Sequence, residues 1–262
     1  MDLVLRLDGS RTYRSLSQLA RILTESWLER NMYCLACDSD VLCPERPGKP
    51  VLDFTCPKCG ERYQLKSQKK PFGGTIANSA YENKVNAIRT GTNPSYLFLQ
   101  YDFRSRRVVN LFAVPKDFIS ESAVKKRSPL RISARRAGWV GSTILLRNLP
   151  QDARIYVIRD GHIIPEAVVR HMWERFFFMR DKSVESRGWL VDVLSCVRRV
   201  RKETFSLADL YAFEEELRDL HPGNRNIRPK IRQQLQVLRD KGIIDFKGHG
   251  VYSALVSAKL SR

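Results

Sequence analysis

The architecture of the N-terminal part follows from one segment, Val51-Leu-Asp-Phe-Thr-Cys-Pro-Lys-Cys-Gly-Glu-Arg-Tyr-Gln-Leu-Lys-Ser67. Apolar, aromatic and β-branched residues at its two ends indicate short strands over Val51–Thr55 and Arg62–Ser67. The Pro and Gly residues between them favour a turn, and this turn carries Cys56 and Cys59. We therefore expect a hairpin whose connecting loop presents two thiols.

A second Cys-x-x-Cys pair precedes the hairpin, at Cys34 and Cys37. Two such pairs complete a tetrahedral shell of four sulfurs, the usual arrangement in structural zinc sites. A redox role for the pairs is the alternative, but two pairs at this spacing favour zinc. Four thiolates leave no open coordination position, so a bound ion would stabilise the fold without taking part in catalysis. Cys43 and Cys196 lie outside the two pairs.

The hairpin also carries a candidate catalytic group, formed by Asp53 on one strand and by Gln64 and Lys66 on the other. Gln64 and Lys66 are two residues apart, so their side chains point to the same face of a strand. A phosphodiester hydrolase needs oxygen ligands for Mg²⁺ and a cation near the attacking water or the scissile phosphate. These three residues offer both. The alternative is an ordinary exposed strand face, because Asp and Lys are common on protein surfaces.

Charge indicates the class of partner. The chain has 262 residues, with 46 Lys and Arg against 28 Asp and Glu, and a formal net charge of +18. Such a surplus favours nucleic acid or an anionic membrane. No apolar run approaches the ~18 residues of a membrane span, and the N-terminal residues lack a signal-peptide pattern. Nucleic acid in the cytoplasm is therefore expected, with a basic protein lacking any polyanionic partner as the alternative.

The order of elements before residue 182 predicts a mixed α/β sheet. A basic loop rich in Ser and Arg is expected at Lys125–Ser142, before the last strand. Helices are expected at Ser15–Arg30 and Ile76–Arg89, and further strands at Tyr96–Tyr101, Val108–Val114 and Arg154–Ile158.

The pattern changes at Arg180–Arg187, a charged stretch with Ser and Gly that is typical of a flexible linker. We therefore divide the chain into residues 1–182 and 183–262. The second part predicts three helices and a two-stranded ribbon, the order of a winged helix. The helices are expected at Trp189–Val200, Leu207–Leu220 and Ile227–Arg239, and the ribbon at Ile243–Lys247 and Val251–Ser253.

The third of these helices has the residue types of a DNA-reading helix. Its apolar stripe is formed by residues at helical spacing, starting from Ile227. Amides suit adenine edges and Arg suits guanine in a major groove, whereas the alternative is a solvated polar face. The side opposite the stripe and its flanks carry the candidate DNA-binding residues Asn226, Lys230, Arg232, Gln233 and Gln236.

A second candidate DNA contact is the loop segment Ser133-Ala-Arg-Arg-Ala-Gly-Trp-Val-Gly141. Arg135 and Arg136 suit phosphate groups, and Trp139 offers an aromatic plate. Packing of Trp139 within the protein is the alternative.

Several segments resemble the DpnI-like family of methyl-directed restriction endonucleases, over nearly the whole chain. The resemblance implies a PD-(D/E)xK restriction-endonuclease-like domain with a zinc knuckle, followed by a winged-helix domain. It also implies Mg²⁺-dependent cleavage of duplex DNA at GATC carrying N6-methyladenine, by a monomer in the bacterial cytoplasm. The matching segments are the two Cys-x-x-Cys pairs, Ala20–Glu25, Asp53-Phe, Leu65-Lys-Ser67, Ala134-Arg-Arg-Ala-Gly-Trp139, Ser186-Arg-Gly-Trp189, Ile231-Arg-Gln-Gln-Leu-Gln236 and Phe246-Lys-Gly248.

One position departs from the family pattern, which has Glu where this chain has Gln64. The resemblance implies Mg²⁺ bound by Asp53, Gln64 and the main-chain carbonyl of Leu65, with Lys66 beside the attacking water. An amide offers Mg²⁺ a dipole where Glu offers a full charge, so metal affinity and water activation should fall. Glu25 is a candidate for a further carboxylate, whereas Glu61 should face away from Gln64.

Within this resemblance, Trp139 is expected to form an apolar wall against the adenine methyl group. Two alternative functions stay open. Gln64 favours a protein that reads methylated DNA without cutting it. A winged-helix transcription regulator would explain the C-terminal third but leave the hairpin face without a purpose.

Overall fold

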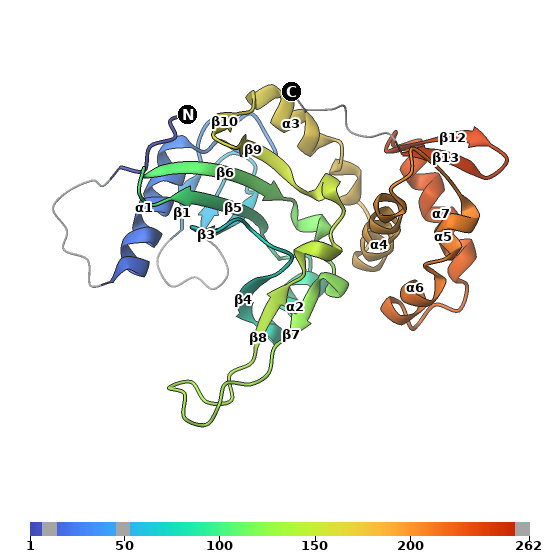
Figure 1. Cartoon of the computed structure of the whole chain (residues 1–262), viewed down its shortest axis with the longest axis horizontal. Coiled ribbons are helices and arrows are strands. Elements are labelled where there is room, and N and C mark those ends of the chain that lie inside the picture. The colour runs from blue at the N-terminus through green and yellow to red at the C-terminus, as the bar shows by residue number, and fades with distance from the viewer. Residues whose placement is uncertain (7–14, 46–52, 255–262) are drawn as a thin grey trace.

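The computed structural model describes residues 1–6, 15–45 and 53–254 of the chain. They form a mixed α/β part followed by a smaller, mainly helical part (Figure 1). The α-helices are α1 (Leu16–Asn31), α2 (Tyr81–Arg89), α3 (Glu166–Glu174), α4 (Val184–Val200), α5 (Leu207–Tyr211), α6 (Glu214–Leu220) and α7 (Ile227–Asp240). Short 3-10 turns lie at η1 (Lys116–Phe118), η2 (Glu121–Ala123), η3 (Leu146–Asn148), η4 (Gln151–Ala153) and η5 (Phe177–Met179).

The strands form three sheets. The largest has the order β1-β2-β3-β5-β6-β9-β10, in which β3 and β5 run parallel and the other neighbours antiparallel. A second sheet has the order β4-β8-β7, and a third β11-β13-β12. The strands are β1 (Cys43–Pro44), β2 (Phe54–Thr55), β3 (Arg62–Gln68), β4 (Ile76–Ala80), β5 (Ser95–Asp102), β6 (Arg107–Val114), β7 (Val124–Lys126), β8 (Gly141–Ile144), β9 (Ile155–Arg159), β10 (His162–Ile163), β11 (Thr204–Ser206), β12 (Ile244–Gly248) and β13 (Val251–Ala254).

Successive side chains of a strand point to opposite faces of the sheet. Both faces of the large sheet are buried, each in its own hydrophobic cluster. On β5, Leu97 and Leu99 belong to a cluster with Trp27 of α1 and Trp173 of α3. The intervening Phe98 belongs to a second cluster, which includes residues of α2, α4 and the C-terminal helices. One face of the sheet is therefore buried against α1 and α3, and the other belongs to the cluster that continues through α4 into the C-terminal part.

The hairpin and most predicted elements are present, but the helix predicted at Ile76–Arg89 is wrong in its first part. Ile76–Ala80 is the strand β4, paired antiparallel with β8, and α2 begins only at Tyr81. Pairing with a strand far along the chain overrides the local helical pattern here. Val51 and Leu52, the start of the first predicted strand, lie outside the described residues.

The C-terminal part is a helix-turn-helix unit with a β-ribbon. Its first helix begins at Val184, earlier than predicted, with the Ser183 side chain accepting a hydrogen bond from the Ser186 N–H. The single helix predicted at Leu207–Leu220 is wrong, because the chain forms α5 and α6 with a break between Tyr211 and Glu214. The predicted ribbon is present as β12 and β13, and β11 adds a third strand.

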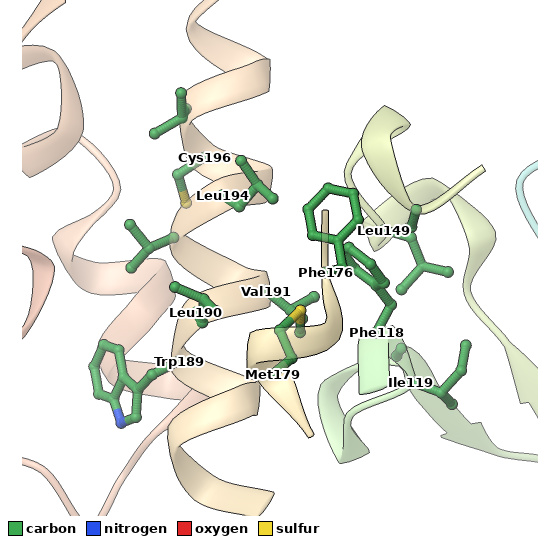
Figure 2. Packing of buried hydrophobic residues seen from close by; sticks show 14 of the residues in the cluster. Phe118, Ile119, Leu149, Phe176, Met179, Trp189, Leu190, Val191, Leu194 and Cys196 are labelled. Atoms are coloured by element: carbon green, nitrogen blue, oxygen red, sulfur yellow. The ribbon is translucent and has the colours of Figure 1, made fainter. Parts of the chain in front are cut away.

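Helix α4 joins the two parts, and Figure 1 shows it between the sheet and the other C-terminal helices. Its buried apolar residues belong to one hydrophobic cluster, which also includes residues of both parts of the molecule. Figure 2 shows Val191 and Leu194 facing Phe176 and Met179. Ion pairs add to this contact: Arg187 lies 3.3 Å from Asp117 and Arg198 lies 2.7 Å from Asp152. The prediction of a flexible linker at Arg180–Arg187 is therefore wrong. This segment is held against both parts of the molecule.

Within residues 1–6, 15–45 and 53–254, every helix is too short or too polar to cross a bilayer.

Candidate active site and DNA-binding surfaces

The four cysteines of the two pairs converge in the structure. The Sγ atoms of Cys34, Cys37, Cys56 and Cys59 all lie within 4.8 Å of one another, and two of these separations are 3.6 Å. Zn–S bonds of about 2.3 Å in a tetrahedron place sulfurs about 3.8 Å apart, so the spacing fits a zinc ion. The cluster could hold zinc, as its sequence spacing indicated, and Cys43 is not part of it.

The backbone around this cluster suits thiolates. Burial raises the pKa of Cys56, but the N–H groups of Cys59 and Lys58 donate to its sulfur and outweigh burial. The pKa of Cys56 is thereby lowered to about 6. On the other pair the Ala36 N–H donates to the Cys34 sulfur over 3.4 Å and partly opposes burial, which raises the pKa of Cys34. Because metals bind the thiolate form of cysteine, these donors prepare the cluster for a cation.

The structure brings Asp53, Gln64 and Lys66 together on the hairpin. Asp53 directly precedes β2, and its Oδ2 accepts a 2.8 Å hydrogen bond from the Leu65 N–H on β3. The Asp53 N–H donates to the Tyr63 carbonyl over 3.1 Å, which fixes the start of the hairpin. The carboxylate is therefore aimed across the two strands at the segment that carries Gln64 and Lys66.

Gln64 and Lys66 point to the sheet face whose hydrophobic cluster includes Ile88 of α2. In the parallel register Gln64 pairs with Tyr96 and Lys66 with Phe98, both in the cluster of that face. The Gln64 side chain is 8% exposed, and its Oε1 accepts no hydrogen bond from the described residues. A buried oxygen that accepts no hydrogen bond is suited to bind a cation. The Gln64 Oε1 and the Asp53 carboxylate are therefore oxygen ligands of the kind that Mg²⁺ prefers.

Burial and charge shape the ionisation of this group. Burial raises the pKa of Asp53, which the Leu65 N–H and the Lys66 ammonium partly oppose. Burial lowers the pKa of Lys66, and the Asp53 carboxylate opposes that shift. A carboxylate and an ammonium in mutual electrostatic contact, both partly desolvated, are typical of catalytic sites.

The sequence did not identify the polar residues that contact Tyr96, the neighbour of Gln64 on β5. On α2, Lys84 is fully buried, and its ammonium lies 4.8 Å from the centre of the Tyr96 ring. On β4, the buried Asn78 amide donates to the Tyr96 hydroxyl over 2.8 Å. The signal for Lys84 was its helical spacing to Tyr81 and Ile88, which places it on the buried side of α2.

Two further acidic residues near the hairpin have other partners. Glu25, a candidate for a further carboxylate, pairs with Arg21 over 2.7 Å, and Arg21 in turn interacts electrostatically with Asp53. Glu61 accepts a 2.7 Å hydrogen bond from the Ser95 hydroxyl and pairs with Arg180 over 3.1 Å. Glu61 therefore ties β3 to β5 and to the segment before α4.

The loop predicted at Lys125–Ser142 is shorter than expected, because the paired strands β7 and β8 occupy its two ends. The remaining loop extends away from the rest of the molecule (Figure 1). Arg135 and Arg136 are exposed on it. The Arg136 guanidinium lies 4.8 Å from the centre of the Trp139 ring, and the ring lies against the backbone of Gly141. A Cβ at Gly141 would lie 2.7 Å from that ring, so glycine permits this packing. Trp139 is thus partly covered by its own loop.

The predicted polar face of α7 is solvent-accessible. Asn226 precedes the helix, and Asn226, Arg232, Gln233 and Gln236 are exposed, whereas Lys230 is half-buried. The opposite side packs into the core through Ile231 and others. Arg232 donates a 3.1 Å hydrogen bond to the Tyr211 hydroxyl of α5. The helix therefore exposes a row of amides and cations, the residue types that suit base edges and phosphates in a groove of DNA.

Replacing Gln236 with Ala should weaken binding to the cognate DNA sequence by about 1–3 kcal/mol, the usual value of a good amide-to-base contact. Non-specific binding should be unchanged, because Gln236 carries no charge. Fluorescence anisotropy with cognate and scrambled duplexes measures both. Gln18→Ala is the matched control, an exposed glutamine on α1. Equal affinities of the wild type and Gln236→Ala for the cognate duplex would exclude base contact by Gln236.

Two family models match this chain. The family model described as DpnI: Dam-replacing family matches residues 1–182. The model described as the Dam-replacing HTH domain matches residues 185–254. The first match contains the hairpin group and the cysteine cluster, and the second contains α7 and its polar face.

Proposed function

The chain belongs to the Dam-replacing family, and on this premise we propose that it is a type II restriction endonuclease. It cleaves duplex DNA at GATC carrying N6-methyladenine, by Mg²⁺-dependent hydrolysis of a phosphodiester bond. In this proposal residues 1–182 are a PD-(D/E)xK catalytic domain and residues 183–262 a winged-helix domain that binds DNA. The net charge of +18 suits a polyanionic substrate.

The observation that carries the proposal is the group on the hairpin face. Asp53 and Lys66 interact electrostatically. The Gln64 Oε1, which accepts no hydrogen bond from the described residues, lies on the same face as Lys66. The Asp53 carboxylate and the Gln64 amide oxygen would hold Mg²⁺, together with the Leu65 main-chain carbonyl. The four-cysteine cluster would hold a structural zinc ion beneath the hairpin turn.

Each side chain has a defined part in the proposed reaction. When bound, Mg²⁺ polarises the phosphate and lowers the pKa of a coordinated water. Asp53 is kept in place by the Leu65 N–H, which holds its carboxylate across the hairpin. Lys66 orients the attacking water or stabilises the negative charge that develops on the phosphate. Arg135 and Arg136 bind the DNA backbone from the β7–β8 loop, and the exposed residues of α7 contact bases.

Plasmid cleavage tests the proposal. Plasmid from a strain with adenine methylation at GATC should be cut in Mg²⁺ and left intact in EDTA. The same plasmid without methylation should be cut far more slowly. Equal cutting of both plasmids would contradict methyl dependence, and cutting in EDTA would contradict the metal requirement.

Gln64 favours one second candidate, a protein that reads methylated DNA without cutting it. An amide brings no charge to the metal, so Asp53 would be the only ionised ligand among the three proposed ligands. Tight binding to methylated plasmid, with no cleavage at any Mg²⁺ concentration, would support this second function.

Replacing Trp139 with Ala should reduce the preference for methylated over unmethylated GATC duplex. One buried methyl group contributes only about 1 kcal/mol by transfer, so the loss should be about fivefold for each methyl group that Trp139 contacts. Paired anisotropy titrations with the two duplexes measure the preference. An unchanged ratio of the two affinities would mean that Trp139 does not form the methyl-binding wall.

A further inference from the structure

Lys84 is a buried lysine to which the proposed reaction assigns no role. Its side chain has no exposed surface, and its Nζ has no hydrogen-bond partner among the described residues. An ammonium removed from water without a partner costs several kcal/mol, so unpaired buried lysines are rare in stable folds. Buried polar groups that lack partners are often found where a substrate or an ion completes the site.

The position of Lys84 relates it to the hairpin group. Its ammonium lies over the Tyr96 ring, and Tyr96 is the direct neighbour of Gln64 in the β3–β5 register. Burial lowers the pKa of Lys84 to about 7, and the Lys66 ammonium lowers it further, so the two groups are close enough to interact. Lys66 and Lys84 therefore approach one sheet face from two elements, β3 and α2.

The charges of this face do not balance. Asp53 interacts with Lys66, while Glu25 and Glu61 are paired with arginines. Gln64 is neutral and its buried Oε1 has no donor among the described residues. Lys66 and, in its protonated form, Lys84 thus set two positive charges against one carboxylate in a largely buried part of the molecule. An anion placed there would be stabilised by both lysines.

We propose that Lys84 is a further electrostatic residue of the site, which supplies a second positive charge to the scissile phosphate of DNA. The proposal rests on the nuclease function and adds a residue to it. The phosphate is the anion that the two lysines lack in the free protein. Lys84 acts together with Lys66 on the charge that develops during cleavage, in a site where the neutral Gln64 contributes none.

Lys84→Met tests this through three measurements. Removal of an unpaired buried charge should raise the Tm of the zinc-loaded protein by about 3 °C or more. It should also lower the single-turnover cleavage rate at saturating DNA and Mg²⁺ by about tenfold or more. Binding of Mn²⁺ alone, followed by calorimetry, should tighten by about fivefold or more, because a like charge near the metal ligands is lost.

The controls separate a functional charge from a structural one. Lys69→Met removes a lysine that also lies over an aromatic ring, Phe103, but is exposed, and its Tm should match the wild type. Lys84→Gln provides a second uncharged variant in case methionine packs poorly. A lower Tm in both Lys84 variants, with unchanged Mn²⁺ affinity, would assign Lys84 to the fold and overturn the proposal. A higher Tm with unchanged cleavage and Mn²⁺ binding would overturn it too.

Failure of the nuclease function would be recognised separately. If the wild type cuts no DNA, the proposed function fails, and the Tm and Mn²⁺ titrations still decide whether Lys84 places its charge at the hairpin group.

Discussion

Asp53→Asn should abolish DNA cleavage, lowering the single-turnover rate by about a thousandfold, or on the order of 4 kcal/mol in activation free energy. Asn has nearly the shape of Asp, and its side-chain oxygen can still accept the hydrogen bond from the Leu65 N–H. The fold should therefore persist, and the Tm should be unchanged or higher because burial disfavours the charged carboxylate. Cleavage of a labelled methylated duplex measures the rate.

The matched control is Asp219→Asn, an exposed aspartate on α6 in the other part of the molecule. It should cleave like the wild type. Asp53→Asn should still bind the methylated duplex, which distinguishes loss of catalysis from loss of binding. If Asp53→Asn cleaves within about tenfold of the wild type, a difference below 1.4 kcal/mol, the hairpin face is not the active site.

Cys56→Ser should destabilise the protein strongly, because it removes one of the four thiolates of the zinc cluster. Structural zinc contributes about 10–16 kcal/mol of apparent binding free energy in zinc-finger peptides. Loss of one of four thiolates should therefore cost about 4 kcal/mol or more, equivalent to roughly 10 °C in Tm. Cys56 is buried and lies at the hairpin turn that leads to Gln64 and Lys66, so cleavage should fall with stability.

Cys43→Ser is the control, because Cys43 is exposed and not part of the four-cysteine cluster. Its Tm should equal that of the wild type. Atomic absorption should give one zinc ion per chain for the wild type and Cys43→Ser, and less for Cys56→Ser. A wild-type protein that contains no zinc and is equally stable with and without a chelator would contradict the zinc assignment.

The parts of the site that sequence predicted depend on short-range geometry. Two Cys-x-x-Cys pairs need only to converge on one ion, and the thiol cluster follows from that requirement. The shared face of Gln64 and Lys66 follows from the two-residue period of a strand. The polar face of α7 follows from helical periodicity in the same way. Local rules were therefore sufficient for these features.

The parts that sequence missed depend on long-range pairing. β3 and β5 are parallel neighbours, which puts Tyr96 beside Gln64. β4 forms because it pairs with β8, more than sixty residues later, and this pairing positions α2 with Lys84. The segment Arg180–Arg187 reads as a charged linker, yet Arg180 pairs with Glu61 and Arg187 pairs with Asp117. Local composition does not encode these contacts.

The central claim is that Gln64, despite its neutral amide, belongs to a working Mg²⁺ site. Single-turnover cleavage of a methylated GATC duplex across a Mg²⁺ titration, for the wild type and Gln64→Glu, tests it most directly. We predict that the wild type cleaves, and that Gln64→Glu reaches half its maximal rate at a Mg²⁺ concentration lower by about tenfold or more, since a full charge replaces a dipole. Tight binding of the duplex by the wild type, with no cleavage at any Mg²⁺ concentration, would contradict the claim.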